Sequence, residues 1–424
     1  MAGLLVAGGC ASGTPAPAAP AAPAAPAGKP AAAAPITQAP AGGAVKLAVV
    51  NPITGPNAQY GQQSVEGIKF AVEEINAAGG VLGKKLEFVV EDTASDKAQS
   101  VALVRRYGAQ ADVVALLGFA STGEFIPSSE AAAEAKVVAM STSSAGVWPK
   151  EFNDWTFRDT TVSDRAIPAY LKLLKEKQNL KTLAVIYDSD NDFNAIETEF
   201  VKKEAPSQGL ELLAVEAHRA RDADFGPQLT RIMSRNPDAI LIESRTNEAA
   251  AIIQQARQRG YKGHLLGSQT LADPTVFRLA GQAVDGVLIY QSFNLERDKT
   301  RDLNERWKKA FGGKSVSKEN IQAYDAIYLL VDAMKRAGTT TDRQKIRDAL
   351  GATKGFAGAD AEYTFNGKGD NATQHVYLFK MTKEGTYRAH RRHRRSERDA
   401  GSGALDRRAR QARPARRRRA ALAL

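Results

Sequence analysis

From Val45 to about Tyr387 the chain alternates short apolar runs with longer amphipathic stretches. Val45–Val50 is almost wholly apolar, which is typical of a strand that helices cover on both faces. Ser64 opens a stretch with apolar residues at helical spacing that ends at Gly79-Gly80, so a helix is predicted there. Further short apolar runs predict strands at 86–90, 113–117, 137–140, 183–187, 210–215, 239–242 and 264–266. Helices are predicted between them at 96–107, 128–135, 193–205, 224–235 and 247–259.

Repeated strand–helix units with short connections predict parallel sheets with helices on both faces. The units are too many for one sheet, and the alternation restarts after an irregular stretch near 148–162. We therefore predict an α/β fold of two doubly wound parallel-sheet lobes. Ligands of such sheets bind beyond the carboxyl ends of the strands. Loops rich in Ser, Thr, Gly and Asn follow the predicted strands at 51–61, 118–123, 141–146 and 268–270.

The net charge of +11 is concentrated at one end of the chain. Residues 388–424 contain 14 Arg, no Lys and three acidic residues, so this tail carries the whole excess and the remainder is neutral. A nucleic-acid-binding protein would spread Lys and Arg over a folded face, so no nucleic-acid partner is expected. We predict a disordered Arg-rich tail that an out-of-frame reading or an unrelated extension would produce. The alternative is an arm that is attracted to anionic lipid or nucleic acid.

The N-terminal segment has the composition of a tether. Residues 11–44 are almost wholly Ala, Pro, Gly, Ser and Thr, which cannot bury a core and predict a disordered Pro/Ala tether. Residues 1–10 end in an apolar run, small residues and Cys10, which resembles the end of a bacterial lipoprotein signal. The apolar run is short and no Lys or Arg precedes it, so we expect a truncated signal with the true start upstream. A stray Cys in a disordered segment is the alternative.

Signatures of catalysis and of cofactor binding are missing from the sequence. The single Cys rules out a disulfide framework and a Cys-based metal site. The five His form no pair at metal-ligand spacing in the body of the chain. Segment 118–123 lacks the first Gly of a hydrolase elbow, and 79–85 departs from the phosphate-loop pattern. We therefore expect binding without catalysis, and no cofactor or metal. No run of about 18 apolar residues predicts a membrane span.

The loops resemble those of a known family in a fixed order along the chain. The resemblance rests on Asn51–Gly61, Gly67–Phe70, Ala71–Gly80, Gly83–Leu86, Glu91-Asp92, Asp224-Phe225, Gln254–Arg257 with Gly260, Ala280-Gly281 with Asp285–Val287, and Tyr324–Ala326. In this series the chain resembles bacterial leucine/isoleucine/valine-type (branched-chain amino acid) binding proteins of ABC importers, over its whole body. That family has the type I periplasmic-binding fold.

The resemblance implies two lobes that are joined by three crossings and close on a ligand by a hinge motion. Lobe 1 would comprise 45–160 plus 291–354, and lobe 2 would comprise 161–290 plus 355–387. The crossings would lie near 158–161, 290–292 and 355–363.

The resemblance also implies a role and a location. The chain would be a monomeric, extracytoplasmic subunit that delivers a small-molecule ligand to an ABC permease in the inner membrane. It would lie in the periplasm or at the cell surface, with membrane contact through lipid on Cys10. The alternative function is a ligand-sensing module of the same fold that reports to a membrane receptor.

Ligand-binding residues are implied one position at a time. The family's loop Tyr corresponds to Tyr60, and the hydroxyl that receives the ligand carboxylate corresponds to Thr122, with Ser121 beside it. This loop opens a helix, whose N-terminus favours an anion; helix capping by the same hydroxyls is the alternative. The next loop offers Ser143 and a backbone carbonyl at Ser144. The remaining family positions fall on Phe193, Arg245 and Gln269.

Departures from the family pattern concern the ligand's amino group. The family's Thr that meets this group is Gly146 here, and its Glu is Gln269, whereas Arg245 adds a possible two-pronged carboxylate contact. A buried ammonium without an acidic partner is costly. We therefore predict that the ligand need not be an α-amino acid, and that an aliphatic or aromatic acid would also fit. Acidic partners for an amino acid remain available at Asp188, Asp190 or Asp192, and apolar walls at Phe119, Phe125, Phe193 or Trp148, unless these aromatic residues belong to a lobe core.

Overall fold

The computed structural model describes residues 43–146, 154–365, 369–372 and 375–389. The predicted signal with Cys10, nearly all of the predicted tether, Trp148 and residues 390–424 lie outside the described residues. The helices are α1 (Ala58–Ala77), α2 (Lys97–Gly108), α3 (Thr122–Glu134), α4 (Ser163–Gln178), α5 (Asp192–Ser207), α6 (Gly226–Met233), α7 (Thr246–Gln258), α8 (Pro274–Ala280), α9 (Asp298–Ala310), α10 (Lys318–Ala337) and α11 (Arg343–Gly351), with 3-10 turns η1 (Gln269–Ala272) and η2 (Gly281–Val284).

The strands alternate with these helices over most of the chain. They are β1 (Val45–Asn51), β2 (Leu86–Asp92), β3 (Val113–Gly118), β4 (Val138–Ser141), β5 (Thr156–Arg158), β6 (Thr182–Asp188), β7 (Glu211–His218), β8 (Ala239–Glu243), β9 (His264–Gly267), β10 (Leu288–Gln291), β11 (Phe356–Ala357), β12 (Glu362–Tyr363), β13 (Tyr377–Met381) and β14 (Tyr387–Ala389). The predicted tail starts two residues too early, because β14 continues to Ala389.

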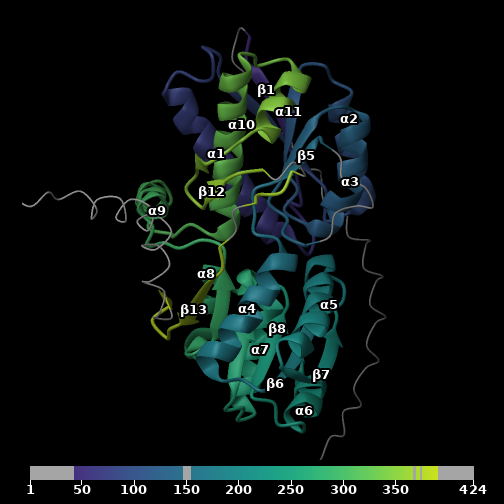
Figure 1. Ribbon diagram of the computed structural model, residues 1–424, viewed down its shortest axis with the longest axis vertical. Coiled ribbons are helices and arrows are strands. Elements are labelled where there is room, and N and C mark those ends of the chain that lie inside the picture. Colours follow the sequence, from purple (N-terminus) through teal and green to yellow (C-terminus); the bar gives the residue numbers. More distant parts are fainter. Residues whose placement is uncertain (1–42, 147–153, 366–368, 373–374, 390–424) are drawn as a thin grey trace, which may run out of the picture. The chain divides into compact units, whose positions relative to one another are not determined.

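Two sheets organise the chain into two lobes (Figure 1). The N-lobe, which we define as β1–β5 with α1–α3 and α9–α11, holds a five-stranded parallel sheet of order β2-β1-β3-β4-β5. The C-lobe, defined as β6–β10, β13 and β14 with α4–α8, holds a seven-stranded sheet of order β14-β13-β10-β9-β8-β6-β7. Its β6–β10 run parallel, and β13 pairs with β10 antiparallel. The predicted two-lobed, doubly wound fold is confirmed.

Burial on both faces of each sheet explains the continuous apolar runs. In β3 and β8 every residue is buried, as expected when helices cover both faces of a parallel sheet. Each lobe accordingly has two apolar cores, one on each side of its sheet. In the N-lobe, Leu47 and Val49 of β1 belong to one core, and Ala48 and Val50 belong to the other.

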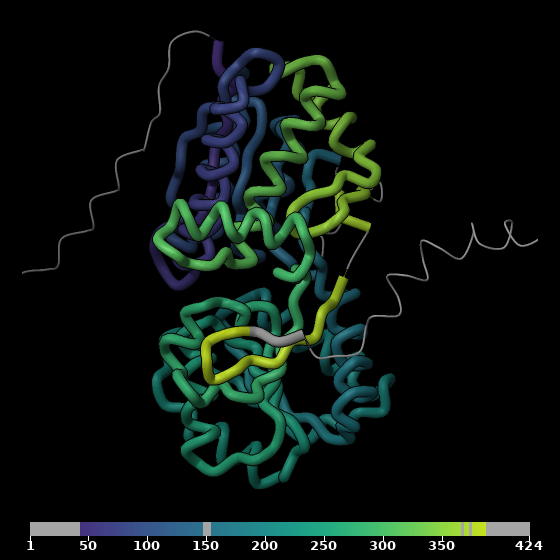
Figure 2. Tube along the Cα trace, turned by 90° about the vertical axis from the view of Figure 1, so that its left-hand side faces the viewer, coloured from purple at the N-terminus to yellow at the C-terminus, as the bar shows by residue number. Residues whose placement is uncertain are grey.

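The chain passes between the lobes three times. The first crossing connects β5 to α4, and the second connects β10 to α9. The predicted third crossing at 355–363 is wrong, because Ala359, Tyr363 and Phe365 belong to the N-lobe core. The chain joins the C-lobe sheet only at β13, which lies alongside that lobe in Figure 2 (yellow). Segment 355–365 therefore belongs to the N-lobe.

Polar contacts hold the crossings together. Gln322 of α10 donates from Nε2 toward Thr160 Oγ1 (3.1 Å), Ser292 Oγ (3.4 Å) and Asp360 Oδ2 (3.3 Å), so one amide touches the first and second crossings and the loop before β12. Arg158 at the end of β5 forms a buried, two-pronged ion pair with Asp370, through Nε at 2.7 Å and Nη2 at 2.9 Å. The crossing segments are therefore anchored on the N-lobe.

Two helices begin earlier than the sequence pattern predicts. The first starts at Ala58 instead of after Ser64, and the third starts at Thr122 instead of Ser128. Both serines are fully buried in helix interiors, where Ser64 Oγ accepts from Asn51 and Ser128 Oγ pairs with Ser100 Oγ. A hydroxyl with a tertiary partner no longer marks a helix start, so the capping rule misplaced the start of the first helix.

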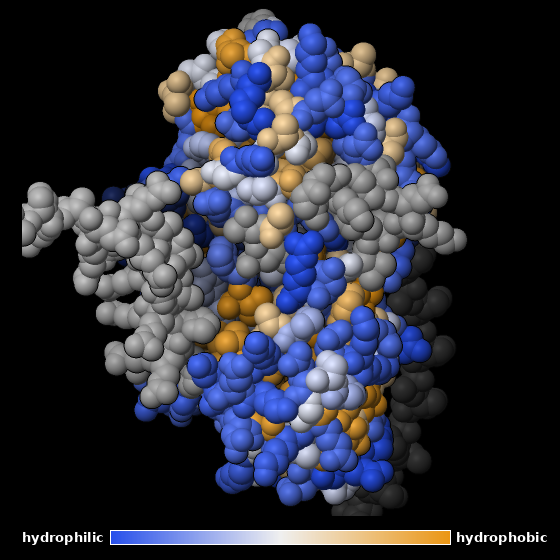
Figure 3. Space-filling view, in the orientation of Figure 1, coloured by the Kyte–Doolittle hydropathy of each residue, from blue (hydrophilic) through white to orange (hydrophobic). Residues whose placement is uncertain are grey.

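The described surface is mostly polar. Hydrophilic side chains cover most of the face in Figure 3. Among the large apolar side chains that the structure describes, only Leu82 and Leu279 are exposed. No helix in the described part of the chain combines the length and the apolar character that crossing a membrane requires.

Candidate ligand-binding site

A cavity lies where loops and helix N-termini of the two lobes meet. About 410 Å³ of space lies between the surrounding atoms, part of it open to solvent. Most of the lining residues have hydroxyl, amide or charged side chains. The lining residues are Asn57, Tyr60, Ala120, Ser121, Thr122, Ser143, Ser144, Asn191, Phe193, Thr270, Lys318 and Glu319.

Helix N-termini converge on this cavity. Asn57, Ser121 and Asn191 are the N-cap residues of α1, α3 and α5, and Lys318 is the first residue of α10. A helix N-terminus presents N–H donors and a partial positive charge. The cavity therefore favours an anionic group.

The N-termini of α1 and α3 have no side-chain cap, and that of α3 lies beside a hydroxyl of the cavity wall. Ser121 makes no side-chain capping bond, whereas Asn191 and Ser317 accept hydrogen bonds from backbone amides of their own helices. Ser121 Oγ instead accepts from Asn57 Nδ2 at 3.2 Å. The first-turn amides of α3 are thus left for another acceptor, next to the hydroxyl of Thr122 in the cavity wall. The structure brings the predicted residues Ser121 and Thr122 together with Tyr60.

A buried carboxyl lies in the same turn of α3. Glu124 accepts a hydrogen bond from Thr93, and burial raises the pKa of Glu124 to about 7. The hydrogen bond from Thr93 opposes this shift. Because the protonated form is favoured, Glu124 contributes little negative charge beside the anion receiver below pH 7.

The loop after β4 has a different role from the predicted one. Ser143 and Ser144 line the cavity. The Ser144 carbonyl, however, accepts from both the amide (2.9 Å) and the hydroxyl (2.8 Å) of Ser163 in α4. The prediction that this carbonyl is offered to the ligand is therefore wrong in this arrangement of the lobes.

Position 146 does not face the cavity. A Cβ placed on Gly146 would lie 2.6 Å from the amide nitrogen of Asp164 and 3.0 Å from the ring of Phe200. Close approach of α4 and α5 therefore requires glycine here. Its lack of a hydroxyl says nothing about the ligand's amino group, so the inference that we drew from Gly146 was wrong.

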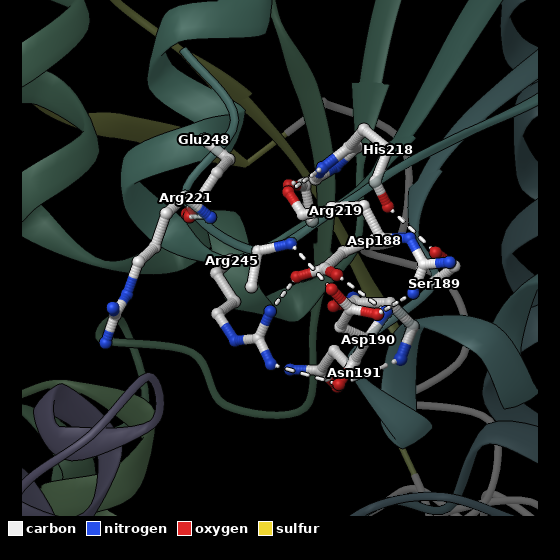
Figure 4. A network of polar contacts seen from close by, with 12 residues as sticks. Asp188, Ser189, Asp190, Asn191, His218, Arg219, Arg221, Arg245 and Glu248 are labelled. Atoms are coloured by element: carbon white, nitrogen blue, oxygen red, sulfur yellow. Dashed lines mark hydrogen bonds and ion pairs between the residues drawn. The ribbon is translucent and has the colours of Figure 1, made fainter.

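Arg245 lies next to the cavity with its charge already paired (Figure 4). Its Nη1 donates to Asp188, its Nη2 to the carbonyl of Asp190 at 3.3 Å, and its Nε to Asn57 Oδ1 of the N-lobe at 3.1 Å. Arg245 and Asp188 are both buried, and Arg245 is not part of the cavity wall. The structure thus places Arg245 as a bridge between the lobes and not as the predicted second receiver of a ligand carboxylate.

The acidic residues that the sequence offers as partners for a ligand ammonium are all paired. Asp188 binds Arg245, Asp190 binds Arg219 at 2.7 Å, and Asp192 binds Lys97 of the N-lobe at 2.8 Å. None of the three offers an uncompensated charge to the cavity.

Gln269 also contacts the opposite lobe. Its Nε2 donates to Ser144 Oγ at 2.8 Å, and its buried Oε1 has no hydrogen-bond partner among the described residues. Close to this position, Glu197 accepts from Ser163 Oγ (2.7 Å) and Tyr290 Oη (2.5 Å). Burial raises the pKa of Glu197, and burial together with the charge of Glu197 raises the pKa of Glu243 well above its ordinary range. This carboxyl pair therefore favours protonated forms.

The predicted apolar residues divide into wall and core. Phe193 lines the cavity, whereas Phe119 and Phe125 pack together in an N-lobe core with ring centroids 5.5 Å apart. Tyr60 lines the cavity, and its hydroxyl has no partner of good geometry among the described residues. Burial raises the pKa of Tyr60.

The sequence pattern missed two charged residues of the wall. Lys318 and Glu319 are 8% and 9% exposed, and Lys318 Nζ lies 3.4 Å from Glu319 Oε1. They follow Ser317, which forms a capping box with Asn320. This pattern marks a helix start, but it does not reveal that the start lies against loops from other parts of the chain.

Hydrogen bonds join the lobes around the cavity. Gln63 Nε2 donates to Asp273 Oδ2 at 2.6 Å, and Gln59 Nε2 lies 3.4 Å from Thr275 Oγ1. These two contacts, together with Asn57–Arg245, Ser144–Gln269 and Lys97–Asp192, are the ones that we call the interlobe contacts. Residues at the site thus hold the two lobes to each other directly.

Comparisons with known proteins identify the family of this chain. A family model described as periplasmic binding protein matches residues 44–386. The leucine-, isoleucine-, valine-, threonine-, and alanine-binding protein of Pseudomonas aeruginosa is 26% identical over 347 residues, which cover 81% of this chain and 91% of that protein. Leu/Ile/Val-binding protein homolog 1 of Brucella abortus is 26% identical over 341 residues, which cover 79% and 90%.

Solved structures share the fold. The leucine binding protein LivK of Thermotoga maritima is 28% identical with a TM-score of 0.75, and the match covers 82% of this chain and 98% of that one. The branched-chain amino acid transporter substrate binding protein LivJ of Streptococcus pneumoniae, solved in complex with isoleucine, has the same TM-score and the same coverage at 24% identity.

Proposed function

Because this chain belongs to the periplasmic binding protein family, we propose that it is the solute-binding subunit of an ABC importer. The family consists of binding proteins that act outside the cytoplasm. Relatives named for amino-acid binding and for transport support the importer role for this chain.

The ligand that we propose is an amino acid or a related small carboxylate. The observation that carries this proposal is the uncapped N-terminus of α3 in the cavity wall, where Ser121 and Thr122 would receive the carboxylate. Backbone N–H donors and the helix dipole act together there.

Hinge closure would couple binding to transport. Tyr60, Ser121 and Thr122 come from the N-lobe, and Phe193 and Thr270 come from the C-lobe. A ligand that touches both sets stabilises the closed form over the open form. The permease would then recognise the closed form.

An α-amino group is not required in this proposal. Gln269 carries no charge, and the nearby Asp188, Asp190 and Asp192 are paired with basic residues. An ammonium group would therefore find no uncompensated carboxylate among these three, and the carboxylate of the wall, Glu319, already faces Lys318 at 3.4 Å. We propose that a carboxylate without the amine binds about as well as its amino-acid counterpart.

A thermal-shift screen of the full chain against amino acids and small carboxylates tests the function. A ligand at 100 times its Kd adds about 2.7 kcal/mol to the free energy of unfolding, so a clear rise in Tm is expected for members of this class. If no amino acid or carboxylate raises Tm at millimolar concentration, the proposed function is wrong.

We also propose anchoring through lipid on Cys10, which lies outside the described residues, a monomeric state and an ABC permease as partner. An alkyne-palmitate label incorporated by cells that express the full-length gene should disappear in Cys10→Ala. Label that persists in this variant would contradict the anchor without affecting the solute-binding role.

A further inference from the structure

One section of the cavity wall is charged. Lys318 and Glu319, the first two residues of α10, both line the cavity and are both buried. We propose that the ligand carries, besides its carboxylate, a neutral group with both a hydrogen-bond donor and an acceptor, such as a carboxamide, that contacts Lys318 and Glu319. This inference rests on the proposed function and narrows its ligand class.

Lys318 and Glu319 use only a small part of their hydrogen-bonding capacity. The contact between Lys318 Nζ and Glu319 Oε1, at 3.4 Å, is longer than an ordinary hydrogen bond. Neither charged group has another hydrogen-bond partner among the described residues. A lysine ammonium has three donors, and a carboxylate has about four acceptor sites. Donors and acceptors therefore remain available toward the cavity.

An aliphatic side chain would be a poor fit against this wall. It would displace water from both charged groups without replacing the hydrogen bonds, which costs free energy at each group. A carboxamide avoids this cost, because its oxygen accepts from Lys318 while its NH₂ group donates to Glu319.

The pair also selects against a second full charge. Lys318 and Glu319 together are neutral, so an additional ammonium or carboxylate on the ligand would be attracted by one member and repelled by the other. A neutral group with both hydrogen-bonding functions satisfies both. The amide and hydroxyl groups of Asn57, Asn191 and Thr270 elsewhere in the wall suit the same polar ligand.

Four ligands of nearly equal shape test the inference by calorimetric titration of the full chain. Asparagine and leucine differ mainly by a carboxamide in place of an isopropyl group. Succinamate and 4-methylpentanoate repeat this difference without the α-amino group. We expect each amide to bind about 10- to 100-fold more tightly than its isopropyl counterpart, as for one or two hydrogen bonds to charged groups.

Variants of Lys318 and Glu319 test whether these residues cause the preference for the amide ligands. Glu319→Leu should reduce the amide-to-isopropyl affinity ratio to about one, whereas Glu319→Gln keeps an acceptor and should retain part of it. Lys318→Met should reduce the ratio in the same way. The matched control is the exposed pair Lys308–Glu305 on α9, at 3.0 Å, which lies outside the wall. Lys308→Met and Glu305→Leu should leave the ratio unchanged.

The results of these titrations distinguish failure of the inference from failure of the proposed function. Equal or tighter binding of the isopropyl ligands overturns the inference and leaves the function intact. If other carboxylates bind and none of these four ligands does, the inference is overturned as well. A Glu319→Leu variant that unfolds at the wild-type Tm and keeps the amide preference also overturns it. If no carboxylate of any kind binds, the proposed function itself fails.

Discussion

Buried charges beside the cavity depend on single partners. Arg245 and Asp188 are 7% and 0% exposed and pair with each other. Two charges that leave water together recover much of the cost through mutual attraction, but a charge left alone does not. Stability should therefore respond very differently to loss of one partner and to loss of both.

Asp188→Asn should lower the free energy of unfolding by about 3–5 kcal/mol, because it leaves the Arg245 guanidinium buried without a counter-charge. The double variant Asp188→Leu with Arg245→Met should recover most of this loss. Urea denaturation measures both. Glu199→Gln, which removes an exposed pair with Lys202 on α5, is the control and should change stability by less than about 1 kcal/mol. Equal losses in Asp188→Asn and the control would contradict the expected dependence.

Thr122→Val removes the hydroxyl next to the N-terminus of α3 while conserving shape. We expect ligand affinity to fall about 10-fold, as for one hydrogen bond to a charged group, with little change in Tm without ligand. Titration calorimetry with the best ligand from the screen measures the change. Thr230→Val is the control, because its hydroxyl donates to the Gly226 carbonyl within α6, at 2.8 Å and away from the cavity. An unchanged Kd in Thr122→Val would place the carboxylate elsewhere.

At the residue scale, the sequence could predict which residues lie at the cavity better than which groups they contact. Ser121, Thr122 and Phe193 line the cavity because they follow strand ends, which is a local property. The partners of Arg245 and of the Ser144 carbonyl come from segments that are distant in the chain or from the opposite lobe. No local pattern encodes such pairings, and these are the residues for which the predicted roles were wrong.

At the element scale, the segments at the crossings contain clustered carboxyl groups. Asp159 follows β5, Asp325 lies in α10, and Asp360 lies in the loop before β12; all three are buried. Burial raises the pKa of Asp325 to about 6 and that of Asp360 to about 7, the latter with help from the charge of Asp325. Burial and the other two carboxylates raise the pKa of Asp159 well above its usual value.

These shifts predict that stability falls as pH rises from about 4 toward 7. The folded protein binds more protons than the unfolded chain over this range, because the unfolded carboxyls titrate near pH 4. Tm measured by calorimetry should therefore be higher at pH 5.5 than at pH 8. Burial lowers the pKa of His218 and His264, so the contribution of these two residues decreases stability as pH falls below about 6.5. The Asp360→Asn variant isolates the carboxyl contribution.

Asp360→Asn keeps the shape and removes one titrating group, so its difference in Tm between pH 5.5 and pH 8 should be smaller than that of the wild type. Asp348→Asn on the exposed face of α11 is the control. An identical pH dependence in wild type and Asp360→Asn would show that this carboxyl is not protonated in the folded state near neutral pH.

Strands were more predictable than helix starts. A strand of a sheet covered on both faces is apolar throughout, so β1, β3 and β8 are visible as runs. Helix starts depend on capping, and a polar residue such as Ser64 or Ser128 serves equally well as a buried tertiary contact. The third crossing was misplaced for a related reason, since β11 and β12 are short strands whose attachment depends on Tyr363 and Phe365 reaching the N-lobe core.

At the scale of the whole molecule, the C-terminal strands complete the C-lobe sheet. β13 pairs with β10, and β14 pairs with β13. A chain that ends after Ala389 should keep the Tm and the ligand affinity of the full chain. A chain that ends after Val376 lacks both strands and exposes the β10 edge, so its Tm should fall clearly. Thermal unfolding of both truncated proteins tests this, and loss of binding in the longer one would give residues 390–424 a role in the fold or the site.

The interlobe contacts bear on how long a bound ligand is retained. Gln59, Gln63 and Lys97 touch the opposite lobe from positions outside the cavity wall. The observed affinity is the intrinsic affinity scaled by the fraction of molecules in the binding-competent arrangement. Weakening the contacts of Gln59, Gln63 and Lys97 would thus shorten the time for which any ligand stays bound, without changing which ligands bind more tightly than others. If the chain binds a solute as proposed, retention and selectivity would be set by separate residues, and one could change in evolution, or be engineered, without the other.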